Sequence, residues 1–148
     1  MEFERSQETL IIGNIASAYK TEHIRLGTFI GGPLIAGYML SENYKAFGDS
    51  AKAKRAWTIS ITVTVLVFAI IILIPEDVKI PNFLFPLVYC WVASYLTQRY
   101  QGAQLTEHIN NGEKVFGWGR VVLVSLIGCA ITVAALLIVL FAMGVILG

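Results

Sequence analysis

Charged residues are scarce in this chain of 148 residues. Asp, Glu, Lys and Arg make up 14% of the sequence, whereas hydrophobic residues make up 56%. A soluble domain carries about 25% charged residues, and a surface this poor in charge aggregates unless lipid covers it. The composition therefore excludes an ordinary soluble domain and a disordered chain, and it indicates a partner in the lipid bilayer. The net charge of +1 gives no reason to expect nucleic acid as a partner.

The residue types that usually carry chemistry are few as well. The two cysteines, Cys90 and Cys129, lie in apolar runs without Cys-x-x-Cys or Cys/His spacing, so we expect them to act as small hydrophobic residues. The two histidines, His23 and His108, lie in different polar regions, and no Ser/His/Asp or His/Glu cluster accompanies either of them. We therefore expect no enzyme, no metal site and no cofactor.

Long stretches without any charge divide the chain. They cover residues 26–41, 56–75, 80–98 and 121–148. A helix needs about 20 apolar residues to cross a bilayer, and polar ends reach back to the interface. We therefore predict an all-α integral membrane protein, a single domain over 1–148 with four spans in antiparallel hairpins. The predicted spans are 22–45, 57–74, 81–98 and 120–147, after an interfacial N-terminal segment, 1–21.

The first predicted span is the least regular of the four. Gly31-Gly32-Pro33 lies at its middle, where proline removes a backbone donor and should kink the helix. A re-entrant segment that enters and leaves the bilayer on one side is the alternative to a full crossing. After it, Gly48-Asp49-Ser50 is typical of a helix stop followed by a new cap, so we expect the first helix to end at Phe47 and another to start near Ser50.

Basic residues near the spans predict the orientation. Inner loops carry more Lys and Arg than outer ones, and this rule favours both termini outside. If the first segment is re-entrant, the N-terminus moves inside and the other spans keep their direction. The predicted inner surface attracts anionic lipid heads or a protein partner, and its basic residues are Lys45, Lys52, Lys54, Arg55, Lys114 and Arg120.

Two further sets of residues are candidates for packing or transport. Small residues spaced four apart let a neighbouring helix approach closely, either within the chain or at a subunit interface. The helix-packing candidates are Gly27, Gly31, Gly32, Pro33, Ala36 and Gly37. The hydroxyls of Thr58 and Thr62 are expected to bond back to their own helix, and a polar path that also includes Asn82 is the alternative.

The Gly31-Gly32-Pro33-Leu-Ile-Ala-Gly37-Tyr38 run, followed by Asn43-Tyr-Lys-Ala-Phe-Gly48, resembles small, uncharacterised multi-span proteins of the bacterial inner membrane. The stretch from Gln101-Gly102 to Gly112 is similar to their second loop. The resemblance implies a multi-pass inner-membrane location and implies no activity.

Together these observations favour a non-enzymatic structural or accessory subunit that packs through a glycine-rich first helix. The alternative is an oligomeric channel or carrier for an uncharged or small solute. A homo-oligomer or another membrane protein is the expected partner in either case.

Overall fold

The computed structural model of the chain describes residues 1–3, 17–75 and 77–147, without the side chains of 145–147. Its regular elements within these ranges are helices, which confirms the all-α class; an isolated bridge pairs Ala18 with Val115. The helices are α2 (Thr21–Gly31), α3 (Pro33–Ala46), α4 (Ser50–Leu73), α5 (Leu84–Asn110) and α6 (Trp118–Leu147). The predicted interfacial segment, 1–21, lies mostly outside the described residues.

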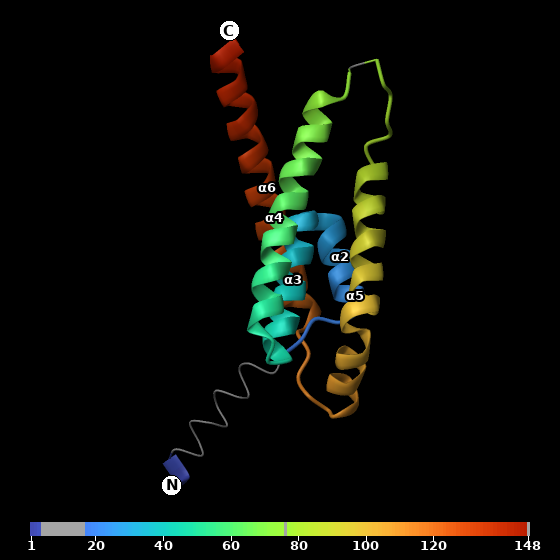
Figure 1. Cartoon of the computed structure of the whole chain (residues 1–148), viewed down its shortest axis with the longest axis vertical. Helices are drawn as coiled ribbons and strands as arrows, with labels where there is room; N and C mark the ends of the chain where they lie inside the picture. The colour runs from blue at the N-terminus through green and yellow to red at the C-terminus, as the bar shows by residue number, and fades with distance from the viewer. Residues whose placement is uncertain (4–16, 76, 148) are drawn as a thin grey trace.

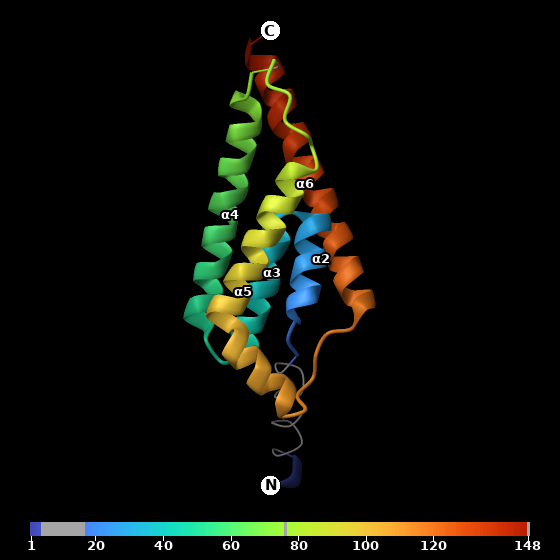
Figure 2. The ribbon, with the colours of Figure 1, turned by 90° about the vertical axis from the view of Figure 1, so that its right-hand side faces the viewer.

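The first predicted span is not one helix. Gly32 separates α2 from α3 with φ 77° and ψ −171°, a conformation that is essentially restricted to glycine. Pro33 then begins α3 at a position where its missing N–H removes no helical hydrogen bond. Because Gly32 turns the backbone and Pro33 starts a new helix, the chain reverses into a helical hairpin, α2–α3, instead of continuing through a kink (Figure 2).

The two ends of the α2–α3 hairpin lie together. The backbone N–H of Tyr19 donates to Oδ1 of Asn43 at 2.6 Å, and Nδ2 of Asn43 donates to the Tyr19 carbonyl at 2.9 Å. A continuous helix over 22–45 would hold these two residues at opposite ends. The prediction of one continuous helix over 22–45 is therefore wrong, and the hairpin has the shape of the re-entrant alternative.

Each of the three long helices, α4, α5 and α6, packs mainly against the hairpin. Figure 1 shows the hairpin among their lower portions, while the upper portions of α4 and α6 continue beyond it. Helices α4 and α5 run antiparallel, as predicted, but they pack on the hairpin instead of on each other, and Figure 1 shows the hairpin between them. The hairpin is thus the centre of the fold.

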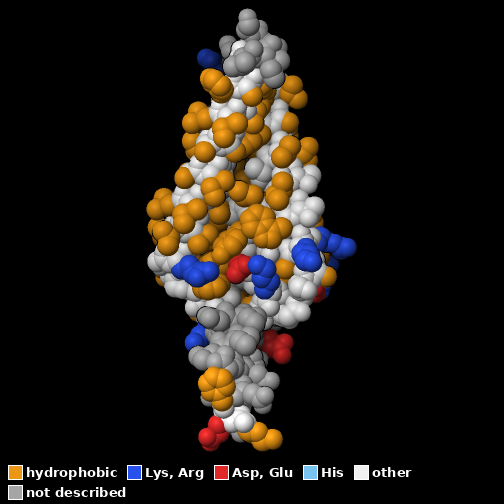
Figure 3. All heavy atoms as spheres, turned by 90° about the vertical axis from the view of Figure 1, so that its left-hand side faces the viewer, with side chains coloured by type: hydrophobic (Ala, Val, Ile, Leu, Met, Phe, Trp, Pro, Cys, Tyr) orange, Lys and Arg blue, Asp and Glu red, His pale blue; other side chains and the backbone are white. Residues whose placement is uncertain are grey.

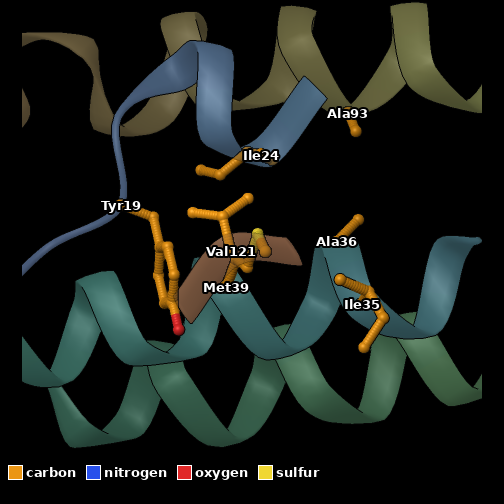
Figure 4. Close-up of a cluster of buried hydrophobic side chains, with 7 residues drawn as sticks. All are labelled: Tyr19, Ile24, Ile35, Ala36, Met39, Ala93 and Val121. Atoms are coloured by element: carbon orange, nitrogen blue, oxygen red, sulfur yellow. The ribbon is translucent and has the colours of Figure 1, made fainter. Parts of the chain in front are cut away.

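The hydrophobic core forms where these elements meet. Tyr19 precedes α2, Ile24 comes from α2, Met39 from α3 and Val121 from α6, and all four side chains are fully buried. Figure 4 shows their side chains between the ribbons, with Ile35, Ala36 and Ala93 completing the cluster. Since α4 contributes no residue to this cluster, it is held by contacts of another kind, which involve Gly37 of α3.

Local signals account for most helix ends. Helix α3 ends at Ala46, Gly48 has φ 79°, and the Asp49 carboxylate accepts from the Lys52 backbone N–H at 3.0 Å to cap α4. The predicted stop and restart are therefore confirmed to within a residue. Helix α5 begins at Leu84, three residues later than the predicted span start, and continues to Asn110.

Two helices, α4 and the Trp118–Gly144 part of α6, are long and apolar enough to cross a membrane. Figure 3 shows hydrophobic side chains over the upper part of one face, above a row of Lys and Arg. This pattern gives weak support to membrane insertion.

The two ends of the described chain lie far apart. Trp118, at the start of α6, lies beside His23 at the base of the hairpin, so the far end of α6 is about 45 Å away from it. The chain near Tyr19 and the end of α6 therefore lie at opposite ends of the molecule, whereas the predicted orientation placed both termini on one side.

Candidate functional site

Glycines of the hairpin bring its helices close to their neighbours. A Cβ on Gly27 would lie 2.5 Å from the Met39 methyl carbon, and one on Gly31 would lie 3.0 Å from the Ser125 carbonyl oxygen of α6. A larger residue at Gly31 would push α2 away from α6, whereas one at Gly27 would have to displace the flexible end of the Met39 side chain. The predicted close approach is therefore made within the chain, by contacts with its own helices.

Helix α3 meets α4 at Gly37. A Cβ there would overlap the Ser60 side chain and lie 3.3 Å from the Ala56 carbonyl oxygen. The Ser60 hydroxyl also donates to the Pro33 carbonyl at 2.7 Å, across the same contact. Ala36 is buried beside it, whereas Gly32 has open space around its Cα and serves the turn. Of the six packing candidates, Gly32 and Pro33 thus shape the turn of the hairpin, and the other four lie in its contacts, either between its two helices or with neighbouring helices.

A buried amide cluster closes the base of the hairpin. Besides its two bonds to Tyr19, Asn43 donates to Oε1 of Gln101 on α5 at 3.1 Å, and Nε2 of Gln101 donates to the Leu40 carbonyl at 2.9 Å. Both amides are fully buried, so each lost partner would leave a polar group without water or protein. This amide clamp (Tyr19, Asn43, Gln101) was missed by sequence reasoning. The only signal was an uncharged amide near the polar end of each of two apolar helices.

An aromatic cluster attaches α6 to the same end. The Arg120 guanidinium lies 4.3 Å from the Phe116 ring centroid and donates from Nε to the Tyr19 hydroxyl at 3.1 Å. Tyr19 stacks on Phe116 at 4.3 Å and contacts Tyr38, which in turn contacts Trp57. Burial raises the pKa of Tyr19 to about 12, so its hydroxyl stays protonated while it accepts from Arg120.

The predicted basic residues fall into two groups. Lys45 and Lys52 form ion pairs with Glu42 and Asp49, at 2.7 and 3.0 Å. Lys54 and Arg55 are exposed and have no ion pair among the described residues. Lys114 is exposed too, and its backbone joins the base of the fold by accepting from Ala18. All of them, with Arg120, lie toward the base of the hairpin, because they are at the ends of helices that meet there.

The polar-path residues are not brought together. The Thr58 hydroxyl donates to the Lys54 carbonyl at 3.1 Å, and the Thr62 hydroxyl donates to the Thr58 carbonyl at 2.9 Å. Both side chains are exposed on α4, and Asn82 is exposed in the turn before α5. The hydroxyls are satisfied by their own helix, which was the main expectation, and no path through a single chain joins these three residues.

Both histidines have structural partners. His108 is buried, with Nε2 at 2.9 Å from the Lys114 carbonyl and Nδ1 at 2.6 Å from the Glu113 carboxylate, so it fixes the turn after α5. Nδ1 of His23 accepts from the Lys20 backbone N–H at 3.2 Å, and its ring meets Trp118 edge-on. Burial, and secondly the Lys20 charge, lower the pKa of His23. Within the described part of the chain, no three metal-ligating side chains gather.

A groove runs between α3, α4 and α5, with a volume of about 550 Å³. Lys52, Arg55, Tyr44 and Tyr100 line it at the base of the fold, and apolar side chains such as Ile59 line the remainder. We refer to it as the α3–α4–α5 groove. Sequence reasoning did not anticipate it, since it results from the separation of α4 and α5 by the hairpin.

Comparison of the chain with protein-family models, with curated proteins and with solved structures gives no match.

Proposed function

We propose that the chain is a multi-pass protein of the bacterial inner membrane and a non-enzymatic structural or accessory subunit. In this proposal α4, α5 and α6 cross the bilayer, and the hairpin enters from one side and returns to it. The connectivity supports three crossings. If α4 crosses, α5 must cross back, because Gln101 near its end contacts Asn43, just before α4 begins.

The distribution of basic residues supports an orientation with the hairpin base inside. Lys54, Arg55, Lys114 and Arg120 are at that end, whereas Lys79 lies in the turn at the other end of α4. Under the positive-inside rule the base faces the cytoplasm. The described chain before α2 then lies inside and the end of α6 outside, which replaces the prediction of both termini outside.

One observation carries the subunit role: beyond the hairpin, α4 and α6 expose large apolar side chains and have little of the chain to pack on. Leu66 and Leu73 on α4 are 56% and 79% exposed, and Leu137 and Phe141 on α6 are 60% and 75% exposed. In the hairpin, by contrast, the small residues are already occupied by internal contacts. We propose that a span of a different membrane protein packs on the free portions of α4 and α6.

Native mass spectrometry of the protein, purified gently from its membranes, tests the proposal. We expect a particle that contains this chain and a different protein. Replacing Phe141 with Ala should reduce the amount of bound partner, because it removes a large exposed side chain beyond the hairpin. Leu123→Ala is the matched control, since Leu123 is 59% exposed near the base of α6. A closed homo-oligomer without another protein would contradict the subunit role and favour the channel.

A further inference from the structure

The α3–α4–α5 groove combines two chemistries along its length. Apolar side chains of three helices, among them Ile59, Val63, Val92 and Leu96, line its walls, and two cations, Lys52 and Arg55, lie at its base end. A volume of about 550 Å³ is within the usual range of ligand-binding cavities, about 300–1,000 Å³. An occupant must therefore be apolar over most of its length and anionic at one end.

We propose that this groove binds one anionic glycerophospholipid, with an acyl chain along the apolar walls and its phosphate at Arg55 and Lys52. A basic recess between transmembrane helices on the cytoplasmic side is a recurrent form of lipid-headgroup site. The proposal rests on the membrane placement of α4 given above, and it is independent of the subunit role.

Of the two cations at the base end of the groove, Arg55 is the principal contact for the phosphate. Lys52 is shared, since its Nζ lies 3.0 Å from the Asp49 carboxylate and 5.9 Å from the Tyr44 ring centroid. Arg55 has neither a hydrogen bond nor an ion pair within the described ranges, and a guanidinium matches a phosphate with two parallel hydrogen bonds. Tyr100 on α5 lines the groove opposite these cations, and its hydroxyl is a further donor for the headgroup.

The architecture also explains why the groove is open to an acyl chain. Helices α4 and α5 are held apart by α3, whose Pro33, Ala36 and Gly37 form the floor of the groove. These are small or compact side chains, and α4 is held against them by the Ser60–Pro33 hydrogen bond. The space between the two long helices thus remains unfilled by the chain itself.

Lipid titration followed by native mass spectrometry tests the proposal on detergent-purified full-length protein. The probes are phosphatidylglycerol and phosphatidylcholine with identical acyl chains. We expect one phosphatidylglycerol to bind with higher affinity than phosphatidylcholine. Arg55→Gln should weaken its binding about fivefold, the equivalent of about 1 kcal/mol for a single basic residue at the membrane surface. Lys54→Gln, on the neighbouring exposed position outside the groove, should leave the affinity unchanged.

A second pair of variants tests the apolar walls. Ile59 lines the groove and is 54% exposed, whereas Ile61 is 50% exposed and does not line it. Ile59→Trp should reduce phosphatidylglycerol binding and Ile61→Trp should not, at equal thermal stability. Equal affinity for the two lipids, or equal losses in Arg55→Gln and Lys54→Gln, would overturn the proposal. So would a homodimer that Ile59→Trp dissociates, because a second copy would then occupy the groove. A variant that loses the lipid but keeps its protein partner in the membrane separates this proposal from the subunit role.

Discussion

Adding a methyl group to Gly37 is the sharpest perturbation of the α3–α4 contact. A Cβ at this position would overlap the Ser60 side chain, and the Ala56 backbone behind it leaves α4 no local adjustment. Gly37→Ala therefore forces α3 and α4 apart, and it weakens the Ser60–Pro33 hydrogen bond at the same contact. The same substitution removes a glycine from a helix interior, which by itself is favourable.

These effects can be weighed against one another. Overpacking of a close contact costs about 1–3 kcal/mol, and loss of a neutral hydrogen bond costs about 1 kcal/mol. The higher helix propensity of alanine offsets about 1 kcal/mol. We therefore expect Gly37→Ala to lower the free energy of unfolding by about 1–3 kcal/mol. For a chain of this size, a loss of about 2 kcal/mol lowers the midpoint of thermal unfolding by about 4–8 °C.

Gly102→Ala provides the matched control for thermal unfolding in detergent, followed by circular dichroism. Gly102 is also inside a helix, α5, but its Cβ would meet open space. The substitution should therefore leave stability unchanged or raise it by up to about 1 kcal/mol, through helix propensity alone. Equal midpoints for the two variants would refute the close approach of α3 to α4, and with it the position of the hairpin at the centre of the fold.

Further predictions concern the base of the hairpin. Cysteines can be introduced at Glu22, Ser50 or Lys79 in a background without the native cysteines. The cysteines at Glu22 and Ser50 should react with a membrane-impermeant maleimide from the same side of the membrane, and the one at Lys79 from the other side. Labelling of Glu22 and Ser50 from opposite sides would support a spanning helix over 22–45. Asn43→Ala should destabilise the protein by about 2–4 kcal/mol in chemical unfolding, because it leaves buried groups of the amide clamp without partners. A loss below about 0.5 kcal/mol, the size of a surface effect, would contradict the clamp. The lowered pKa of His23 means that the folded state favours the neutral ring, so stability should fall as the pH drops from about 7 through the unfolded value near 6.5. His23→Gln should flatten this dependence in thermal scans, and an unchanged slope would assign it to another group.

Local sequence signals predicted where α3 ends and α4 begins, because the residues that end a helix act over one turn. Gly48 and Asp49 stop α3 and cap α4 through contacts within four residues. The same signals could not distinguish a kink from a reversal at Gly32. That choice depends on the contact between Tyr19 and Asn43, which are 24 residues apart.

The candidate residues were predicted less completely for a related reason. The glycines were identified by their spacing, but spacing alone did not determine which helix would pack on each of them. The Asn43–Gln101 bond joins residues 58 positions apart, and neither belongs to a recognisable motif for such a bond.

The hairpin and the α3–α4–α5 groove have one physical origin. In the proposed membrane placement the hairpin reverses within the bilayer, where it is stable only if other parts of the protein surround its irregular backbone, because lipid offers no hydrogen bonds. Helices α4, α5 and α6 provide this surrounding, and each must therefore pack on the hairpin, which prevents them from packing on one another. Their separation leaves the groove between α4 and α5, and it leaves the apolar portions of α4 and α6 free beyond the tip. A variant that straightened the hairpin, such as Gly32→Ala with Pro33→Ala, should therefore abolish the lipid site and partner binding together, although none of the lipid's proposed polar contacts is altered.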